Sequence, residues 1–389
     1  MAAGPLDGLK VVEFAGLGPA PMCAMLMADL GATVIRLDRA RKPSLGVEKP
    51  LQFDLTLRNR PAISIDLKSA AGVAAALELL ATADVCLEGF RPGVMERLGL
   101  GPDQCLSVNR KLVYGRMTGW GQDGPLARNA GHDVNYIALT GALHAIGRAG
   151  QPPTPPLNLV GDYGGGALYL AFGCLAGVLC ARVTGQGQVV DAAMVDGAAS
   201  LMMNFFGNHA AGLNNPERGT NIVDSGAPYY DAYECSDGKF VAVGAIESRF
   251  RQELFAKLGL AHCGITGDDR SEWPKLREAI AAAIRTRTRD EWAAAFAQSD
   301  ACFSPVLSMA EAPDHPHNRA RGTFFKDAAG IVQPGPAPRF SATPAALPGP
   351  PRPVDANVEQ ALLGWGVGIE RIRSWRRDRV VGLTAGAAA

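Results

Sequence analysis

Short apolar runs separated by glycine-rich turns open the chain. The run LKVVEFA (9–15) predicts a buried strand, GLGPAP a tight loop, and MCAMLMADLG an apolar helix that ends at Gly31. The run TVIRLD (33–38) predicts the next strand. The first forty residues therefore predict a β-α-β unit.

The same alternation of strands and helices continues further along the chain. AISIDL (62–67) predicts a strand, a helix follows at about 69–82, and DVCLEGF (84–90) and LVYGRMTGW (112–120) predict two more strands. Strands that alternate with helices at this spacing are typical of an α/β fold with a mostly parallel, doubly wound sheet.

From residue 221 the pattern changes. APYYDAYECSDGKFVAVGAIE predicts two strands joined by an Asp-Gly turn, which is an antiparallel hairpin. Helical patterns follow at about 248–259, 273–286 and 289–298, so we expect a second, smaller α+β domain. Eight prolines between 334 and 353 predict an extended segment, and an amphipathic stretch covers about 355–377.

The composition is that of a globular protein. Apolar residues make up 47% and charged residues 20%, and the 38 Lys+Arg balance the 38 Asp+Glu. This balance argues against a nucleic-acid or membrane-surface partner, although a local basic pocket for an anionic small molecule is compatible with it. The apolar run at 167–181 has 15 residues, fewer than a bilayer requires, and predicts a buried helix.

The eight cysteines (23, 86, 105, 174, 180, 235, 263 and 302) form no C-x-x-C pair and no cluster with zinc spacing. We therefore expect reduced thiols in a cytoplasmic protein, and no metal site. The first residues lack the apolar core of a signal peptide, and the last residues carry no peroxisomal S-K-L address.

The loop GLGPAP is a partial match to a dinucleotide-binding fingerprint. It follows a strand and opens a helix, and Asp38 lies 20 residues after Gly18. The third glycine of the fingerprint is replaced by Pro21, which blocks close packing of the helix on the strand. We therefore interpret the loop as a tight turn that serves the fold.

Two short motifs contain candidate acid/base residues. GHDVNY (131–136) holds His132, and NLVGDYGGG places Asp162 thirty residues later. Taken alone, a single loop histidine is more often structural than catalytic, and the pattern of residues leaves both interpretations open.

Nine segments of the chain together form a more specific pattern than any single motif. They are GPLDGLKVVEFAGLGPAP, DLGATVIRLDR, LRNRPAISIDLKS, EGFRPGVMERLGLGPD, YGRMTGWGQDGP, AGHDVNYIALTG, NLVGDYGGGALYL, GQGQVVDAAMVDG and YECSDGKFVAVGAIE. They occur in the same order as in the family III CoA-transferases, which the chain resembles over about residues 4–345. Within that family they are most similar to the α-methylacyl-CoA racemases.

The resemblance implies an interlocked homodimer in which each chain is threaded through its partner. Each chain would contain a large Rossmann-like domain, a small α+β domain and two long linkers. The expected bounds are 1–191 for the first part of the large domain, 192–222 for a linker, 223–309 for the small domain, 310–337 for a linker and 338–389 for the return to the large domain.

The family implies a racemase of 2-methylacyl-CoA thioesters that works through an enolate. Inverting the carbon beside a thioester carbonyl requires acid/base groups on both faces and hydrogen-bond donors for the enolate oxygen. By the resemblance, His132 takes the proton from the (S) substrate and Asp162 from the (R) substrate. Glu247 of the other subunit would hydrogen-bond His132.

Other residues acquire expected roles from their places in these motifs. Gly164, Gly165 and Gly166 could let backbone N–H groups approach the enolate oxygen at a helix N-terminus. Asp133 favours a cap or turn role. Coenzyme A is part of the substrate, so no separate cofactor is expected. The implied coenzyme A path comprises Arg39, Ile65, Asp66, Leu67, Lys68, Gly89, Phe90, Arg91, Arg97, Gly131, Asp133, Val134, Asn135 and Tyr136.

The family also contains a second chemistry. In a family III CoA-transferase, the aspartate equivalent to Asp162 is a nucleophile that forms an acyl anhydride and then an aspartyl-CoA thioester. That route needs no histidine base, so the presence of His132 and Glu247 favours the racemase. The sequence contains no pattern that identifies the acyl chain.

Overall fold

The computed structural model describes residues 4–40, 46–262, 264 and 266–384, and the chain divides into two compact units. The first unit holds the chain up to Thr140, Leu157–Leu201 and the chain from Gly322 on, and the second holds the remainder. Two of the passages between the units fall inside the predicted linkers, whose bounds stay predictions. Cys263 and both chain ends lie outside the described residues.

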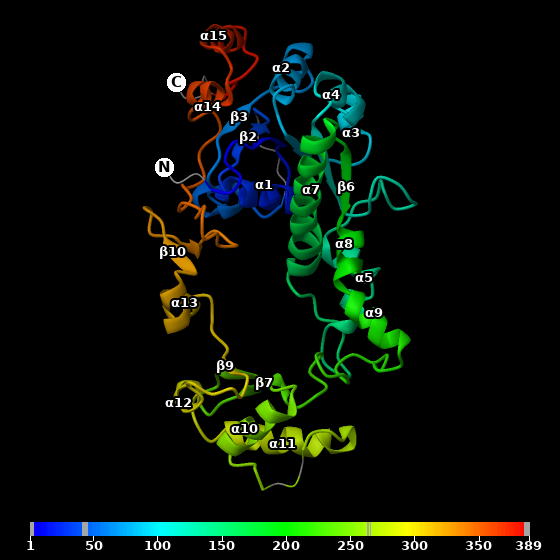
Figure 1. Ribbon diagram of the computed structural model, residues 1–389, viewed down its shortest axis with the longest axis vertical. Helices are drawn as coiled ribbons and strands as arrows, with labels where there is room; N and C mark the ends of the chain where they lie inside the picture. Colours follow the sequence, from blue (N-terminus) through cyan, green and yellow to red (C-terminus); the bar gives the residue numbers. More distant parts are fainter. Residues whose placement is uncertain (1–3, 41–45, 263, 265, 385–389) are drawn as a thin grey trace. The chain divides into compact units, whose positions relative to one another are not determined.

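A six-stranded parallel sheet forms the centre of the first unit (Figure 1), so the predicted parallel sheet is confirmed. The strand order is β3-β2-β1-β4-β5-β6. The strands are β1 (Lys10–Phe14), β2 (Thr33–Asp38), β3 (Ala62–Ser64), β4 (Val85–Glu88), β5 (Val113–Thr118) and β6 (Val189–Ala193). The apolar pattern did not predict β6, a half-exposed edge strand with Asp191 at its centre.

The strand order reverses direction between β1 and β4. β1 pairs with β2 on one side and with β4 on the other, and both pairs are parallel. In a doubly wound sheet this reversal opens a crevice at the carboxyl ends of the strands, where ligands bind. The loops that follow β1 and β4 therefore border the position at which a binding site is expected.

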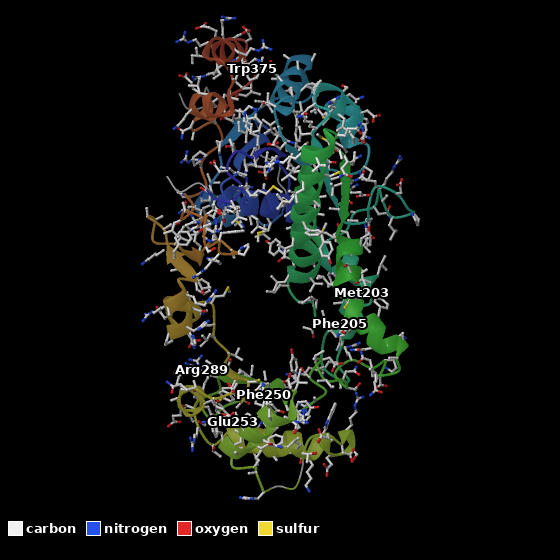
Figure 2. All side chains as sticks on the ribbon, viewed as in Figure 1. Met203, Phe205, Phe250, Glu253, Arg289 and Trp375 are labelled. Atoms are coloured by element: carbon white, nitrogen blue, oxygen red, sulfur yellow. The ribbon has the colours of Figure 1, made fainter. Side chains whose placement is uncertain are left out.

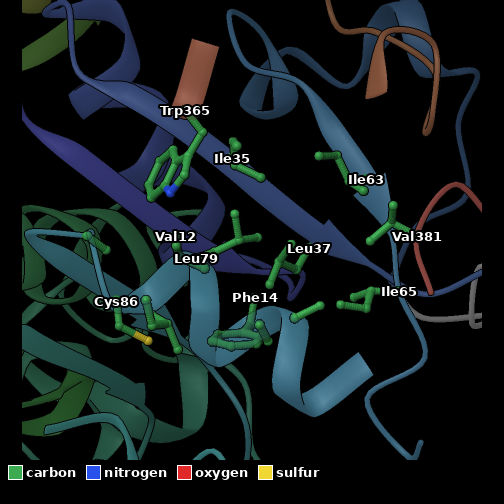
Figure 3. Packing of buried hydrophobic residues seen from close by; sticks show 14 of the residues in the cluster. Val12, Phe14, Ile35, Leu37, Ile63, Ile65, Leu79, Cys86, Trp365 and Val381 are labelled. Atoms are coloured by element: carbon green, nitrogen blue, oxygen red, sulfur yellow. The ribbon is translucent and has the colours of Figure 1, made fainter. Parts of the chain in front are cut away.

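The C-terminal helices complete the core on one face of the sheet. Figure 3 shows Trp365 packed among Val12, Ile35 and Leu79, and Trp375 belongs to the same buried cluster. The predicted amphipathic stretch forms two helices because Gly366, with a φ of 102°, ends the first of them. The helices of this face are α2 (Ala70–Leu80), α4 (Pro102–Val108), α14 (Val358–Trp365) and α15 (Ile369–Arg377).

The opposite face of the sheet is covered by α1 (Pro19–Asp29) and α7 (Leu168–Thr184). A π-helix, η3 (Leu159–Ala167), runs directly into α7, and together they form a continuous helix of 26 residues. By length and composition this helix could span a bilayer, and only 39% of its apolar window is buried within the chain. The helix predicted at 167–181 is observed as α7, and it is buried on the face that contacts β5 and β6.

Helix α8 (Met194–Leu201) crosses η3 at very close range because glycines meet at the crossing. A Cβ on Gly197 would overlap the carbonyl oxygen of Gly165. A Cβ on Gly165 would lie 2.5 Å from the backbone nitrogen of Ala198. Only glycine at both positions allows the two backbones to touch.

Two buried ion pairs fix the chain at the two ends of α1. Arg60 donates through Nε to Glu13 at 2.6 Å and through Nη2 to the carbonyl oxygen of Pro21 at 3.1 Å. Arg58 donates to Asp29 at 2.6 Å. The Glu13 and Arg60 side chains are 0% and 1% exposed, so each charge depends on the other for compensation.

The second unit contains an antiparallel sheet in the order β7-β8-β9, and the predicted hairpin is confirmed as β7–β8. The three predicted helices form, and Phe250 and Glu253 lie on the first of them while Arg289 begins the third (Figure 2). The elements are β7 (Tyr230–Glu234), β8 (Phe240–Gly244), β9 (Phe303–Pro305), α9 (Met203–Ala210), α10 (Ser248–Lys257), α11 (Trp273–Ile284) and α12 (Arg289–Ala295).

Arg60→Met should destabilise the protein by about 3–5 kcal/mol, because it leaves the Glu13 carboxylate buried without its partner. Urea denaturation followed by circular dichroism measures the change. The control Arg373→Met removes a pair with Glu370 whose side chains are 65% and 81% exposed, and it should leave the transition unchanged. Equal effects of the two substitutions would contradict the assigned role of the buried pair.

Gly197→Ala should destabilise the protein by about 3 kcal/mol, at the upper end for overpacking, because the new methyl group meets backbone atoms that cannot rotate away. Gly207→Ala is the control, since α9 leaves open space within 4 Å of that position. The control should be neutral or stabilising by about 0.5–1 kcal/mol. Thermal unfolding of both variants measures the difference, and a tolerated Gly197→Ala would show that the close crossing is not required.

Candidate active site

The turn between β1 and α1 forms one wall of the site. Gly18 has a φ of 66°, and Pro19 occupies the first position of α1. A Cβ on Gly18 would lie 3.3 Å from Oδ2 of Asp162, so the glycine lets the Asp162 carboxyl approach the turn. The sequence analysis assigned this loop to the fold alone and missed its place at the site. Gly18, which occupies the second glycine position of the partial fingerprint, was an available signal.

His132 is the N-cap residue of α5 (Asp133–Ala138) and is exposed. Its backbone N–H donates to Oδ1 of Asn135 at 3.0 Å, which fixes the start of the helix. Because the residue lies at the surface of the first unit, its imidazole is open to a substrate.

Asp162 is half-buried within η3 and accepts a hydrogen bond at Oδ2 from Nδ2 of Asn158, at 3.0 Å. Burial raises the pKa of the Asp162 carboxyl, the Asn158 hydrogen bond lowers it, the Asp133 charge raises it and the His132 charge lowers it. The net effect is a pKa above the ordinary value, which suits a group that must both give and take a proton. Asn158 was missed by the sequence analysis, although its i,i+4 spacing to Asp162 is that of a helix face.

Asp133 is 5% exposed, and its carboxylate is directed at the backbone of η3. Its Oδ2 accepts the N–H groups of Gly161 and Asp162, each at 2.7 Å. The predicted cap role is therefore observed, with the difference that Asp133 caps η3 rather than its own helix. A buried carboxylate has little surface to offer to coenzyme A, so a contact there would involve its main chain.

The hydrogen bonds to Asp133 show which of the sequence-predicted residues lie together, because they place Asp162 beside the segment that carries His132. Burial raises the pKa of Tyr136 in the same segment, the Asp162 charge raises it further and the Arg91 charge lowers it.

Tyr136 holds the 131–136 segment against the end of β5. Its hydroxyl donates to the carbonyl oxygen of Gly131, and its ring packs edge-on against Trp120 with the ring centroids 4.8 Å apart. A Cβ on Gly119 would overlap the same ring. Tyr136 is 7% exposed, so its side chain positions the segment and contributes little surface to a ligand path.

The expected oxyanion role of the glycine run differs from what the structure shows. Gly165 and Gly166 are buried, and Cβ atoms there would meet Ala198 of α8 and Pro19 of α1. The run lies inside a helix rather than at its N-terminus. These glycines therefore allow close packing of η3, and the prediction of a backbone donor site is wrong for both residues.

The implied coenzyme A segments follow β2, β3 and β4, and so lie at one edge of the parallel sheet. The guanidinium of Arg39 lies over the Phe90 ring, 5.9 Å from its centroid, which joins two of these loops. Ile65 is 2% exposed and packs in the core, so its side chain is not available to a ligand.

Four exposed cations of these segments have no acidic partner among the residues that the structure describes. They occupy the loops and the short helix α3 (Val94–Arg97) that follow the strands. Unpaired guanidinium and ammonium groups are suitable partners for phosphates. The four residues are Arg39, Lys68, Arg91 and Arg97.

Glu247 lies in the second unit, three residues after β8, where it is the exposed N-cap residue of α10.

Within the described parts of the chain, no three His, Cys, Asp or Glu side chains are grouped so as to hold a metal ion. A hollow of about 630 Å3 in the first unit is lined by C-terminal residues such as Asp355, Glu359 and Arg376, and by none of the candidate residues.

Solved structures with this fold confirm the architecture. A CaiB/BaiF family protein from Brucella suis has a TM-score of 0.78 against this chain and 22% sequence identity, with coverage of 97% of this chain and 99% of that one. A protein from Mycobacterium tuberculosis has a TM-score of 0.74 and 26% identity, with coverage of 91% of this chain and 98% of that one.

Sequence relatives give a finer comparison. The α-methylacyl-CoA racemase of Mus musculus is 41% identical over 97% of both chains, and that of Homo sapiens is 39% identical over 97% of both. An acyl-CoA transferase of Fusarium pseudograminearum is 31% identical over 97% of this chain and 88% of its own length. Similarity at this level over nearly the whole chain supports an isomerase with the family III fold.

The family model of the family III CoA-transferases matches residues 6–356, which is most of the chain. The resemblance inferred from the nine sequence segments is thereby confirmed. The chain belongs to CoA-transferase family III.

Proposed function

We propose that the protein is a racemase that interconverts the (R) and (S) forms of 2-methylacyl-CoA thioesters. The single observation that carries the proposal is that the Asp133 carboxylate, next to His132 in the sequence, accepts the backbone N–H groups of Gly161 and Asp162 at 2.7 Å each, which supports a shared site for His132 and Asp162. The His132 charge also lowers the pKa of the Asp162 carboxyl, which is consistent with a shared site. The similarity to α-methylacyl-CoA racemases supplies the substrate class.

The proposed reaction moves one proton onto the α-carbon and one away from it. In one direction His132 takes the α-proton of the (S) substrate, and the electron pair of the C–H bond moves into the enolate. The Asp162 carboxyl then gives its proton to the opposite face. The raised pKa of Asp162 supports this role, because a carboxyl with a higher pKa is more often protonated near neutral pH.

Coenzyme A is part of the substrate, and no separate cofactor enters the proposal. The exposed cations Arg39, Lys68, Arg91 and Arg97 would bind its phosphates along the loops after β2, β3 and β4. Their freedom from ion pairs among the described residues supports this assignment, because a paired cation would have to exchange its partner for the phosphate.

We also propose that the protein works as an interlocked homodimer. Helix α7 exposes an apolar stripe at helical spacing, and Phe172 and Val183 are 74% and 88% exposed within the single chain. The stripe consists of Leu168, Phe172, Leu179 and Val183. A contiguous apolar stripe of this kind is typical of a surface that another chain covers. In such a dimer, Glu247 of the partner subunit would hydrogen-bond His132.

The alternative is a CoA-transferase in which Asp162 is the nucleophile. The half-buried carboxyl beside Gly18 is compatible with that role, and the similarity to an acyl-CoA transferase of 31% identity keeps it open. Racemisation has the stronger support because the racemases are 39–41% identical and because acyl transfer gives His132 no task.

His132→Ala should abolish α-deuterium uptake by the (S) substrate, and Asp162→Ala should abolish it for the (R) substrate, because each variant lacks the base for one face. Racemisation should fall by at least about 100-fold in both variants. His317→Ala and Asp314→Ala remove exposed residues outside the site and serve as controls. Full racemisation by either site variant would overturn the two-base mechanism.

Phe172→Asp should weaken association of two chains, because it places a charge in the apolar stripe of α7. Analytical ultracentrifugation at micromolar concentration should show a dimer for the unmodified protein and a smaller species for the variant. Leu347→Asp, which alters an exposed leucine outside the stripe, is the control. A stable and fully active monomer would exclude both the interlocked dimer and a role for the partner subunit's Glu247.

A further inference from the structure

Asp133 connects the two candidate acid/base residues through one side chain. It follows His132 directly in the sequence, and its Oδ2 accepts the N–H groups of Gly161 and Asp162 at 2.7 Å each. The main chain of Asp133 thus belongs to the segment that carries one acid/base group, while its carboxylate is bonded to the backbone that carries the other.

These two bonds satisfy donors that a π-helix leaves free. A π-helix bonds residues five apart, so the first N–H groups of η3, which begins at Leu159, have no acceptor within the helix. Gly161 and Asp162 lie in this first turn, and Asn158 at the N-cap provides no side-chain acceptor. Without the Asp133 carboxylate, the buried N–H of Gly161 would have lost its acceptor.

Glycine at position 161 is required for the carboxylate to reach the backbone. A Cβ on Gly161 would lie 2.6 Å from Oδ2 of Asp133. Because Gly161 has no side chain, the Asp133 carboxylate can approach the backbone of Gly161 and Asp162 closely. The other carboxylate oxygen, Oδ1, is buried and has no hydrogen-bond partner among the residues that the structure describes, so both observed bonds go to Oδ2.

We propose that Asp133 is the positioning residue that sets the separation and orientation of His132 and Asp162 across the substrate. The proposal rests on the proposed racemase function. It assigns the Asp133 side chain a part in the reaction that neither its sequence context nor its place on the coenzyme A path implies: the carboxylate acts through Asp162, whose backbone N–H it accepts.

The charge of Asp133 provides a second, separable effect. The charges of Asp133 and His132, at the start of α5, act on the Asp162 carboxyl, and the Asp162 charge acts on Tyr136 of α5. Asn158, the residue that precedes η3, donates to Oδ2 of Asp162. Helix α1 contributes the uncharged Gly18. The negative charge of Asp133 raises the pKa of Asp162, so removing the charge while keeping the shape should lower that pKa.

Asp133→Ala tests the positioning role. With 2-methylacyl-CoA of one configuration in deuterated water, α-deuterium uptake with retained configuration reports each face separately. Uptake by the (R) substrate, which depends on Asp162, should slow on the order of 100-fold, the loss expected for a misplacement of about 1 Å. Uptake by the (S) substrate, which depends on His132, should change far less.

Asp269→Ala is the matched control, because it removes another aspartate that accepts a backbone N–H, that of Ser271 at 2.8 Å, in the second unit. It should leave both uptake rates unchanged. Equal slowing at both faces by Asp133→Ala would overturn the proposal, since it would indicate a general loss of the site. Unchanged rates at both faces would overturn it equally.

Asp133→Asn keeps the proposal testable if the alanine variant does not fold. Its amide oxygen can still accept both N–H groups, so uptake should persist at both faces. The acid limb of the (R)-face pH profile should move to lower pH, because Asp162 then loses its proton at lower pH. An unmoved limb or a shift to higher pH would contradict the assigned contact. Absence of uptake by the unmodified protein would instead reject the racemase function itself.

Discussion

The candidate site depends on two hydrogen bonds that join the backbone of the π-helix η3 to the buried carboxylate of Asp133. They attach the start of η3 to the start of α5, and so attach the segment of Asp162 to the segment of His132. A buried carboxylate requires hydrogen-bond donors, and the free N–H groups of a helix start require an acceptor. The N–H groups of Gly161 and Asp162 donate to the carboxylate, and the carboxylate provides the acceptor that they lack within the helix. These paired bonds fix the arrangement of the junction.

Contacts from the β1–α1 turn and from α8 hold this junction in place. Gly18 brings the β1–α1 turn against the Asp162 carboxyl, and Arg60 fixes the same turn by bonding to Glu13 and to the carbonyl oxygen of Pro21. On the other side of η3, Gly165 lets α8 approach. Asp162 is thus held by packing on two sides and by hydrogen bonds at its backbone and side chain, as a proton-transfer group at fixed distance requires.

The sequence was sufficient for the sheet and insufficient for the details of η3. Apolar runs between glycines predicted the buried strands. They did not predict β6, because this edge strand exposes about half of its residues and shows no such run. The segment GDYGGG was interpreted as a loop with ligand-facing N–H groups. Close helix packing selects glycine as strongly as ligand binding does, and only the position of α8 distinguishes the two.

The site residues divide in the same way. The family resemblance led to His132 and Asp162, and the carboxylate of Asp133 joins the segments that carry them. Asn158 and Gly18 were missed because their roles arise from contacts between segments that a linear pattern does not relate. Asp133 was expected to cap a turn, but its target, 28 residues away for Gly161, could only be seen in the folded chain.

The most direct test of the central claim, that this site moves an α-proton, is one incubation of the unmodified protein. A 2-methylacyl-CoA of a single configuration is incubated in deuterated water, and α-deuterium content and configuration are measured by mass spectrometry and chiral analysis after hydrolysis. The account predicts deuterium uptake together with loss of configuration. Retained configuration without uptake, accompanied by trapping of Asp162 with hydroxylamine in the presence of an acceptor acid, would contradict it and establish acyl transfer.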